Sequence, residues 1–76
     1  MPTVKGDSGS SVAKVSEISA TSLTSFEDAM QQGLARAAKT LRNIRSAWIK
    51  EQHVRCHEGK ITEYQVNMMV TFVLND

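Results

Sequence analysis

The chain has 76 residues, a formal net charge of +1 and 41% hydrophobic residues. This balance is typical of an ordinary globular domain, and it argues against intrinsic disorder and against nucleic-acid binding through strong positive charge. A single cysteine, Cys56, excludes an internal disulfide, so a chain this short needs another source of stability, and self-association is the common one.

The first residues predict a flexible N-terminal tail over 1–10, because they hold the only proline and two of the four glycines. They lack the apolar segment of a signal peptide, and no later run approaches the roughly 20 apolar residues of a membrane span. We therefore expect a cytoplasmic protein that does not enter a membrane, with a single domain over residues 11–76.

A short strand and a helix are predicted next. Val12–Ile18 alternates loosely between polar and apolar residues, as a strand does. The following run is rich in Ser and Thr, and Thr24 with Glu27, or Ser25 with Asp28, has the spacing of a capping box that begins a helix. The apolar stripe of this helix recurs at steps of three and four residues, at Phe26, Met30, Leu34, Ala37, Leu41 and Ile44.

A second strand is predicted over Ser46–Arg55, which the helix enters without a Gly or Pro break. Alternation places Ala47 and Ile49 on one face of this strand, and Trp48, Lys50 and Gln52 on the other. Because Val54 and Cys56 break the phase of this alternation, we expect a β-bulge near Glu51–His53.

A turn at His57–Lys60 and clean alternation from Thr62 to Leu74 predict a hairpin and a third strand. The order strand-helix-strand-strand predicts an α+β fold, in which a three-stranded antiparallel sheet of order 1-3-2 carries one helix on one face. The other face of the sheet stays uncovered in a single copy. Such a face is typical of a subunit interface or a ligand platform.

The segment GLARAAKTLRNIRSAWIKEQHVR, followed by GKITEYQVNMMVTFVLND, resembles the dodecin family over residues 12–76. The resemblance implies a homo-oligomeric shell of twelve strand-helix-strand-strand subunits with cubic symmetry. It also implies paired flavins, riboflavin or FMN, held between subunits, and a role in storing or buffering the flavin.

Dodecins hold the flavin between a stacking tryptophan at the start of the second strand and a glutamine on the third. Gln65 matches the glutamine, whereas Ser46 stands at the position of the stacking tryptophan. Glu51 corresponds to an acidic residue that lies near the ribityl chain in the family. The resemblance therefore keeps the hydrogen-bonding partner and lacks the stacking partner.

Trp48 lies two residues beyond Ser46 and, by alternation, on the same face of the strand. It offers a displaced stacking platform, with Arg45 or Lys50 near the phosphate of FMN. The alternative is a tryptophan that packs at a subunit contact, and for Gln65 the alternative is a polar residue paired across an interface.

A rival hypothesis is a flavin-less shell with a structural or calcium-binding role. The chain shares five residues with a dodecin branch that lacks the stacking tryptophan, namely Ile44, Arg45, Ala47, Glu51 and Gln52. Some members of that branch bind calcium. Calcium takes six to eight oxygen ligands. The candidate carboxylates converge only through assembly, and they are Glu17, Glu27, Asp28 and Glu58.

The sequence does not indicate an enzyme. Cys56 has His57 only as its chain neighbour, with no third group to orient the histidine. Glu58 and Glu63 are a carboxylate pair without a cleft in so small a subunit. A binding protein is therefore the expected class.

Overall fold

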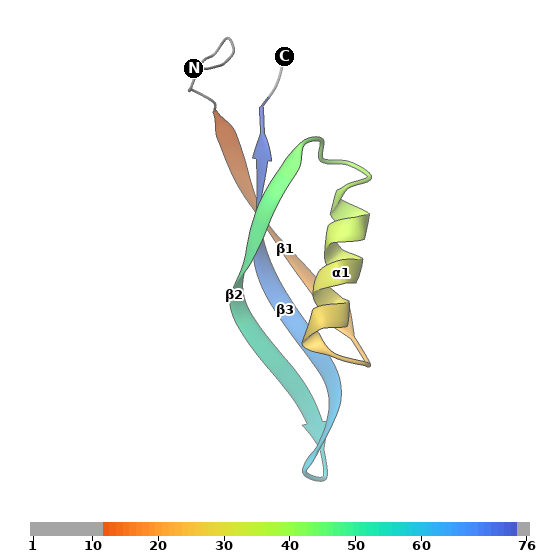
Figure 1. Cartoon of the computed structure of the whole chain (residues 1–76). Helices are drawn as coiled ribbons and strands as arrows, with labels where there is room; N and C mark the ends of the chain where they lie inside the picture. The colour runs from red at the N-terminus through yellow and green to blue at the C-terminus, as the bar shows by residue number, and fades with distance from the viewer. Residues whose placement is uncertain (1–11, 75–76) are drawn as a thin grey trace.

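The computed structural model describes residues 12–74, so the tail predicted over residues 1–10 lies outside the described part. Its elements are β1 (Ala13–Ser22), α1 (Phe26–Ala37), β2 (Ile44–His57) and β3 (Lys60–Val73). The strands form one antiparallel sheet in the order β1-β3-β2, and α1 lies along one face of it (Figure 1). The α+β fold and the strand order predicted from the sequence are confirmed.

Strand β1 is longer than predicted, since it continues past Ile18 to Ser22. The first Ser and Thr residues after the predicted strand pair with β3, with Ser19 opposite Asn67 and Thr21 opposite Gln65. Their polar side chains point away from the helix, whereas Ala20 between them faces it. Small and β-branched polar residues suit a strand with one uncovered face.

The helix is capped by Ser25, whose side chain accepts a hydrogen bond from the backbone N–H of Asp28 at 2.9 Å. Of the two capping pairs that the sequence offers, Ser25 with Asp28 is the one formed. The Asp28 carboxylate also accepts from Ser22 Oγ at 2.7 Å, which ties the start of α1 to the end of β1.

The helix ends at Ala37, so the prediction that its apolar stripe continues through Leu41 and Ile44 was wrong. Leu41 lies in the turn after the helix, where its N–H donates to the Ala37 carbonyl at 2.8 Å. Ile44 begins β2 opposite Phe72. Asn43 between them has φ 61, a left-handed conformation that cannot continue a right-handed helix. The helix therefore reaches the second strand through a turn.

The core lies between α1 and the sheet. Ala29, Val66 and Met68 are fully buried, and they pack against a ring of partly buried residues: Ile18, Ala20, Phe26, Met30, Leu34 and Ile49. Gly33 permits the helix to lie close to the sheet, since a Cβ there would stand 2.8 Å from Met68 Cε and 3.0 Å from Ala20 Cβ.

The β2–β3 hairpin extends beyond the N-terminal end of α1 (Figure 1). Both strands have 14 residues and α1 has 12, which corresponds to about 46 Å of strand against about 18 Å of helix. The predicted turn is confirmed: Glu58 and Gly59 both have positive φ, as a two-residue type I′ turn requires. One helix thus covers less than half of the sheet's length.

Candidate ligand-binding face

The face of the sheet opposite α1 carries the predicted site residues, and we call it the open face. The register of the strands places on it Val15, Glu17, Ser19 and Thr21 of β1, Ser46, Trp48, Glu51 and His53 of β2, and Gln65, Asn67, Met69 and Thr71 of β3. The side chains are mostly polar, and Trp48 is the largest apolar one, with half of its surface exposed.

Two extra residues in β2 decide which of its side chains reach the open face. The register shifts between Ile44 and Ser46 and again between Ile49 and Glu51, so Arg45 and Lys50 each have no residue opposite them in β3. Such insertions are β-bulges, which re-aim the side chains that follow.

The bulge at Lys50 brings Glu51 to the open face, opposite Asn67. If Lys50 were paired and the alternation continued regularly through it, Glu51 would lie on the helix side together with Ile49. The predicted bulge near Glu51–His53 is real but begins one residue earlier, at Lys50. As a consequence Gln52 lies opposite the buried Val66 on the helix side, and its predicted place beside Trp48 was wrong.

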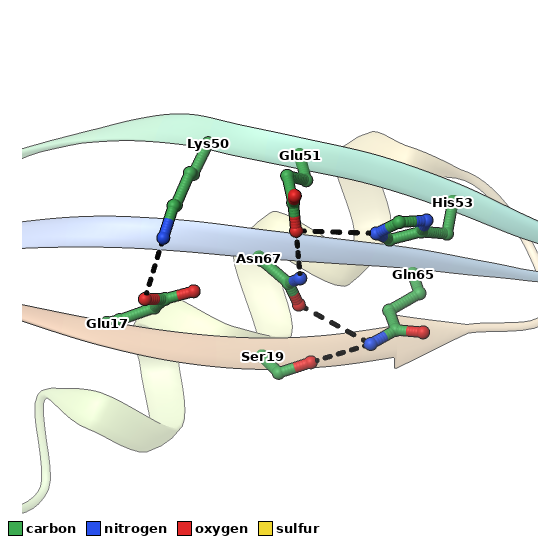
Figure 2. Close-up of polar contacts among 7 residues, drawn as sticks. All are labelled: Glu17, Ser19, Lys50, Glu51, His53, Gln65 and Asn67. Atoms are coloured by element: carbon green, nitrogen blue, oxygen red, sulfur yellow. Dashed lines mark hydrogen bonds and ion pairs between the residues drawn. The ribbon is translucent and has the colours of Figure 1, made fainter.

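Five polar side chains form a continuous chain of contacts across all three strands (Figure 2). Gln65 Nε2 donates to Ser19 Oγ at 3.0 Å and to Asn67 Oδ1 at 3.4 Å. Asn67 Nδ2 donates to Glu51 Oε1 at 2.9 Å, and His53 Nε2 lies 3.5 Å from the same oxygen. The chain thus joins β1 to β2 over the central strand.

The Glu51 carboxylate is the acidic centre of this chain. The hydrogen bond from Asn67, followed by that from His53, lowers the pKa of Glu51 below the ordinary value of a glutamate, because both favour the ionised form. Glu51 therefore acts as a charged acceptor at neutral pH.

A second polar bridge crosses the open face nearby. Lys50 Nζ lies 3.2 Å from Glu17 Oε1, so the ammonium of the bulge residue reaches over β3 to β1 (Figure 2). Both side chains are about half exposed, and exposed pairs of this kind contribute only ~0–1 kcal/mol to stability. Arg45, at the first bulge, is exposed.

The predicted platform residues stand apart from Gln65 within one subunit. Trp48 lies opposite Met69 and Ser46 opposite Thr71, which confirms that the two share the open face. Along β3, however, Met69 is four residues from Gln65 and Thr71 is six, or about 13 Å and about 20 Å. The subunit brings Gln65 and Glu51 into one hydrogen-bonded chain but does not bring Trp48 or Ser46 to it.

The described part of a single subunit contains no enclosed pocket. Within residues 12–74, no three His, Cys, Asp or Glu side chains converge as metal ligands, so the four candidate carboxylates for calcium are not gathered in one copy. Among the described residues, no helix has the length and apolar character of a transmembrane segment.

Sequence reasoning missed Ser19, Asn67 and His53 as members of the chain around Gln65. Asn67 was within reach of prediction, since it lies two residues from Gln65 and alternation puts both on one face. Ser19 and His53 come from other strands. Their approach depends on strand register, which the sequence of one strand does not carry.

Comparison with known proteins identifies the fold family. A family model described as Dodecin matches residues 12–75. Comparison with curated protein sequences gives no match. Among solved structures, an arginine-to-alanine variant of the Thermus thermophilus dodecin has 39% sequence identity and a TM-score of 0.82, covering 88% of this chain and 100% of that chain.

Two further structures agree. Dodecin from Streptomyces davaonensis has 30% identity and a TM-score of 0.81, covering 87% of this chain and 97% of its own. A calcium dodecin from Mycobacterium tuberculosis has 36% identity and a TM-score of 0.73, covering 86% and 93%. With the family model spanning almost the whole chain and the sheet order and helix in agreement, the chain belongs to the dodecin family.

Proposed function

We propose that this chain forms a homo-dodecameric shell that binds a flavin, riboflavin or FMN, between subunits and stores or buffers it in the cytoplasm without catalysing a reaction. The observation that carries the proposal is Gln65, whose amide lies on the open face within an ordered chain of polar side chains. A glutamine at this position of the third strand is the residue that dodecins use to bind the polar edge of the flavin ring. Membership of the dodecin family supports the ligand class.

Self-association is supported by what one subunit leaves uncovered. The core between the helix and the sheet is small, with Ala29, Val66 and Met68 as its buried cluster, and Val15 and Trp48 on the opposite side of the sheet remain 43% and 50% exposed. A chain of this size gains stability by covering such surface with further copies.

A flavin site shared between copies is supported by the separation of its parts. Trp48 and Gln65 lie about 13 Å apart along the sheet of one subunit, whereas stacked rings have centroids about 4.5–7 Å apart. One flavin ring meets both residues most simply when they come from different subunits. In that arrangement Trp48 supplies the displaced platform beside Ser46, Arg45 lies toward the phosphate of FMN, and Glu51 lies toward the ribityl chain.

Titration of riboflavin and FMN with the purified protein, followed by flavin fluorescence, tests the proposal. We expect quenching at micromolar protein, and its absence would remove flavin as the ligand. Gln65→Ala should weaken binding by about tenfold, because a hydrogen bond to the flavin edge is lost. Gln31→Ala, an equivalent change on the exposed surface of α1, should bind as the wild type does.

A variant of Trp48 separates stacking from packing. If Trp48 is the platform, Trp48→Ala abolishes quenching and leaves the mass of the assembly unchanged. A variant that no longer assembles would instead assign Trp48 to a subunit contact.

The second candidate is a shell that holds no flavin and has a structural or calcium-binding role. Ser46 favours it, because dodecins stack the flavin on a tryptophan at this position, and so does the 36% identity to a protein named a calcium dodecin. Calorimetric titration with Ca²⁺ and with riboflavin distinguishes the two, since only the favoured ligand should give a saturable heat. Ser46→Trp should then create or strengthen flavin binding.

A further inference from the structure

The hydrogen-bonded chain on the open face has a fixed direction, which follows from the chemistry of its members. An ionised carboxylate only accepts hydrogen bonds, so Glu51 requires the Nδ2 group of Asn67 to face it. The Oδ1 atom of Asn67 then faces Gln65, and an acceptor there requires the Nε2 group of Gln65. The Ser19 hydroxyl both donates and accepts, so it adapts to the orientation that Glu51 imposes.

Both hydrogens of the Gln65 amide group are used within the protein. One is donated to Ser19 Oγ at 3.0 Å and the other to Asn67 Oδ1 at 3.4 Å. The atom left without a protein partner among these contacts is Oε1, which is an acceptor.

We infer that Glu51 and Asn67 are positioning residues that orient the Gln65 amide so that it offers a ligand only a hydrogen-bond acceptor. This inference rests on the proposed ligand site at Gln65 and specifies its chemistry: the group bound there carries an N–H. The pyrimidine edge of a flavin has one such N–H between two carbonyl oxygens. A ligand edge that offers only acceptors is rejected, since it meets the Gln65 oxygen with another oxygen.

The orientation is observed directly by neutron crystallography of the perdeuterated, ligand-free protein. We expect the two deuterons of Gln65 Nε2 to point at Ser19 and Asn67, and those of Asn67 Nδ2 to include one directed at Glu51. Deuterons of Gln65 directed away from both partners would overturn the inference. This measurement requires no ligand, so it stands whether or not the protein binds flavin.

The role of Glu51 is tested by reversing the donor-to-acceptor direction of the hydrogen bonds that link Gln65, Asn67 and Glu51. In Glu51→Lys the new ammonium only donates, so Asn67 turns its oxygen toward that ammonium and its NH₂ group toward Gln65, which then presents Nε2 to the ligand. Two N–H groups now meet, and riboflavin binding should weaken by about tenfold or more. Glu63→Lys makes the same charge change at a carboxylate that pairs with Arg55 outside the hydrogen-bonded chain, and it should alter riboflavin binding by less than about twofold. Equal losses in the two variants would overturn the positioning role.

If Glu51→Lys does not assemble, a double variant provides the test. It moves the carboxylate from position 51 to position 67, the next member of the hydrogen-bonded chain. In Glu51→Gln with Asn67→Asp, the net charge is unchanged and the new carboxylate on β3 accepts from both neighbours, so Gln65 keeps its orientation. Riboflavin binding close to that of the wild type supports the inference, and loss of binding in an intact assembly contradicts it. If the wild type binds no riboflavin while its neutron structure shows the expected deuterons, the positioning role is upheld and only the flavin proposal fails.

Discussion

At the scale of the residue, Lys50 has an effect out of proportion to its own contacts. Its side chain forms one exposed ion pair, with Glu17, but its backbone is bulged out of the pairing with β3, so Glu51 lies on the open face and not on the side of Ile49. The hydrogen-bonded chain through Asn67 and Gln65 depends on this bulge, because regular alternation through Lys50 would turn Glu51 to the helix side. Deleting Lys50 should remove the bulge and the ion pair but keep Glu51 on the open face, because Glu51 would then follow Ile49 directly in a regular strand opposite Asn67.

The lowered pKa of Glu51 predicts a specific dependence of stability on pH. Its ionised form is favoured in the folded state, first by the hydrogen bond from Asn67 and then by that from His53. The resulting stabilisation is fully present above the pKa of glutamate in the unfolded chain, about 4.3, and is lost as the pH falls through the lower folded value. We expect Glu51→Gln to lower the thermal unfolding midpoint at pH 7 but not at a pH below both values.

Removing the hydrogen bond from Asn67 provides the control for this experiment. Asn67→Ala leaves Glu51 ionisable but without its main hydrogen-bond donor. The difference in thermal unfolding midpoint between this variant and the wild type should therefore also become smaller in acid. If the difference in unfolding midpoint from the wild type stays constant from neutral to acid pH for both Glu51→Gln and Asn67→Ala, the Glu51 interaction is not the source of the pH dependence.

At the scale of the element, the packing of α1 on the sheet depends on Gly33. In Gly33→Val, the first added carbon would already stand 3.0 Å from Ala20 Cβ, which is fixed to the backbone of β1 and cannot move aside. Overpacking of this kind typically costs about 1–3 kcal/mol. We expect Gly33→Val to lose about 2 kcal/mol of unfolding free energy in denaturant titration. Ala35→Val, on the exposed side of the same helix, should change it by less than about 0.7 kcal/mol.

The elements also show what the sequence carries and what it does not. The start of α1 and the part of β3 from Thr62 to Val73 were predictable, because a capping pair and clean alternation are local signals. The end of α1 was missed, since Leu41 and Ile44 keep the helical spacing although Asn43 breaks the backbone. The position of the bulge and the chain from Ser19 to Glu51 depend on how three strands pair, and no local pattern of residues specifies that register.

At the scale of the whole molecule, the proposed assembly has a direct test. Light scattering coupled to size exclusion should give a mass about twelve times that of the subunit, because the open face and the thin core both require coverage by further copies. A monodisperse monomer at all concentrations would contradict both the shell and a site built from two subunits. If the mass corresponds to twelve subunits, the number of flavins bound in the titrations is expressed per pair of subunits.

The mismatch between the short helix and the long β2–β3 hairpin bears on how the protein reaches its native state. The hairpin beyond the helix leaves Val54 40% and Ile61 50% exposed in an isolated copy. A lone chain can form the helix and the hairpin quickly, since both are local, but it cannot bury these residues by itself. We expect the late phase of refolding to be bimolecular, with a rate that rises with protein concentration in stopped-flow experiments. Newly made chains would then complete folding only when they encounter one another.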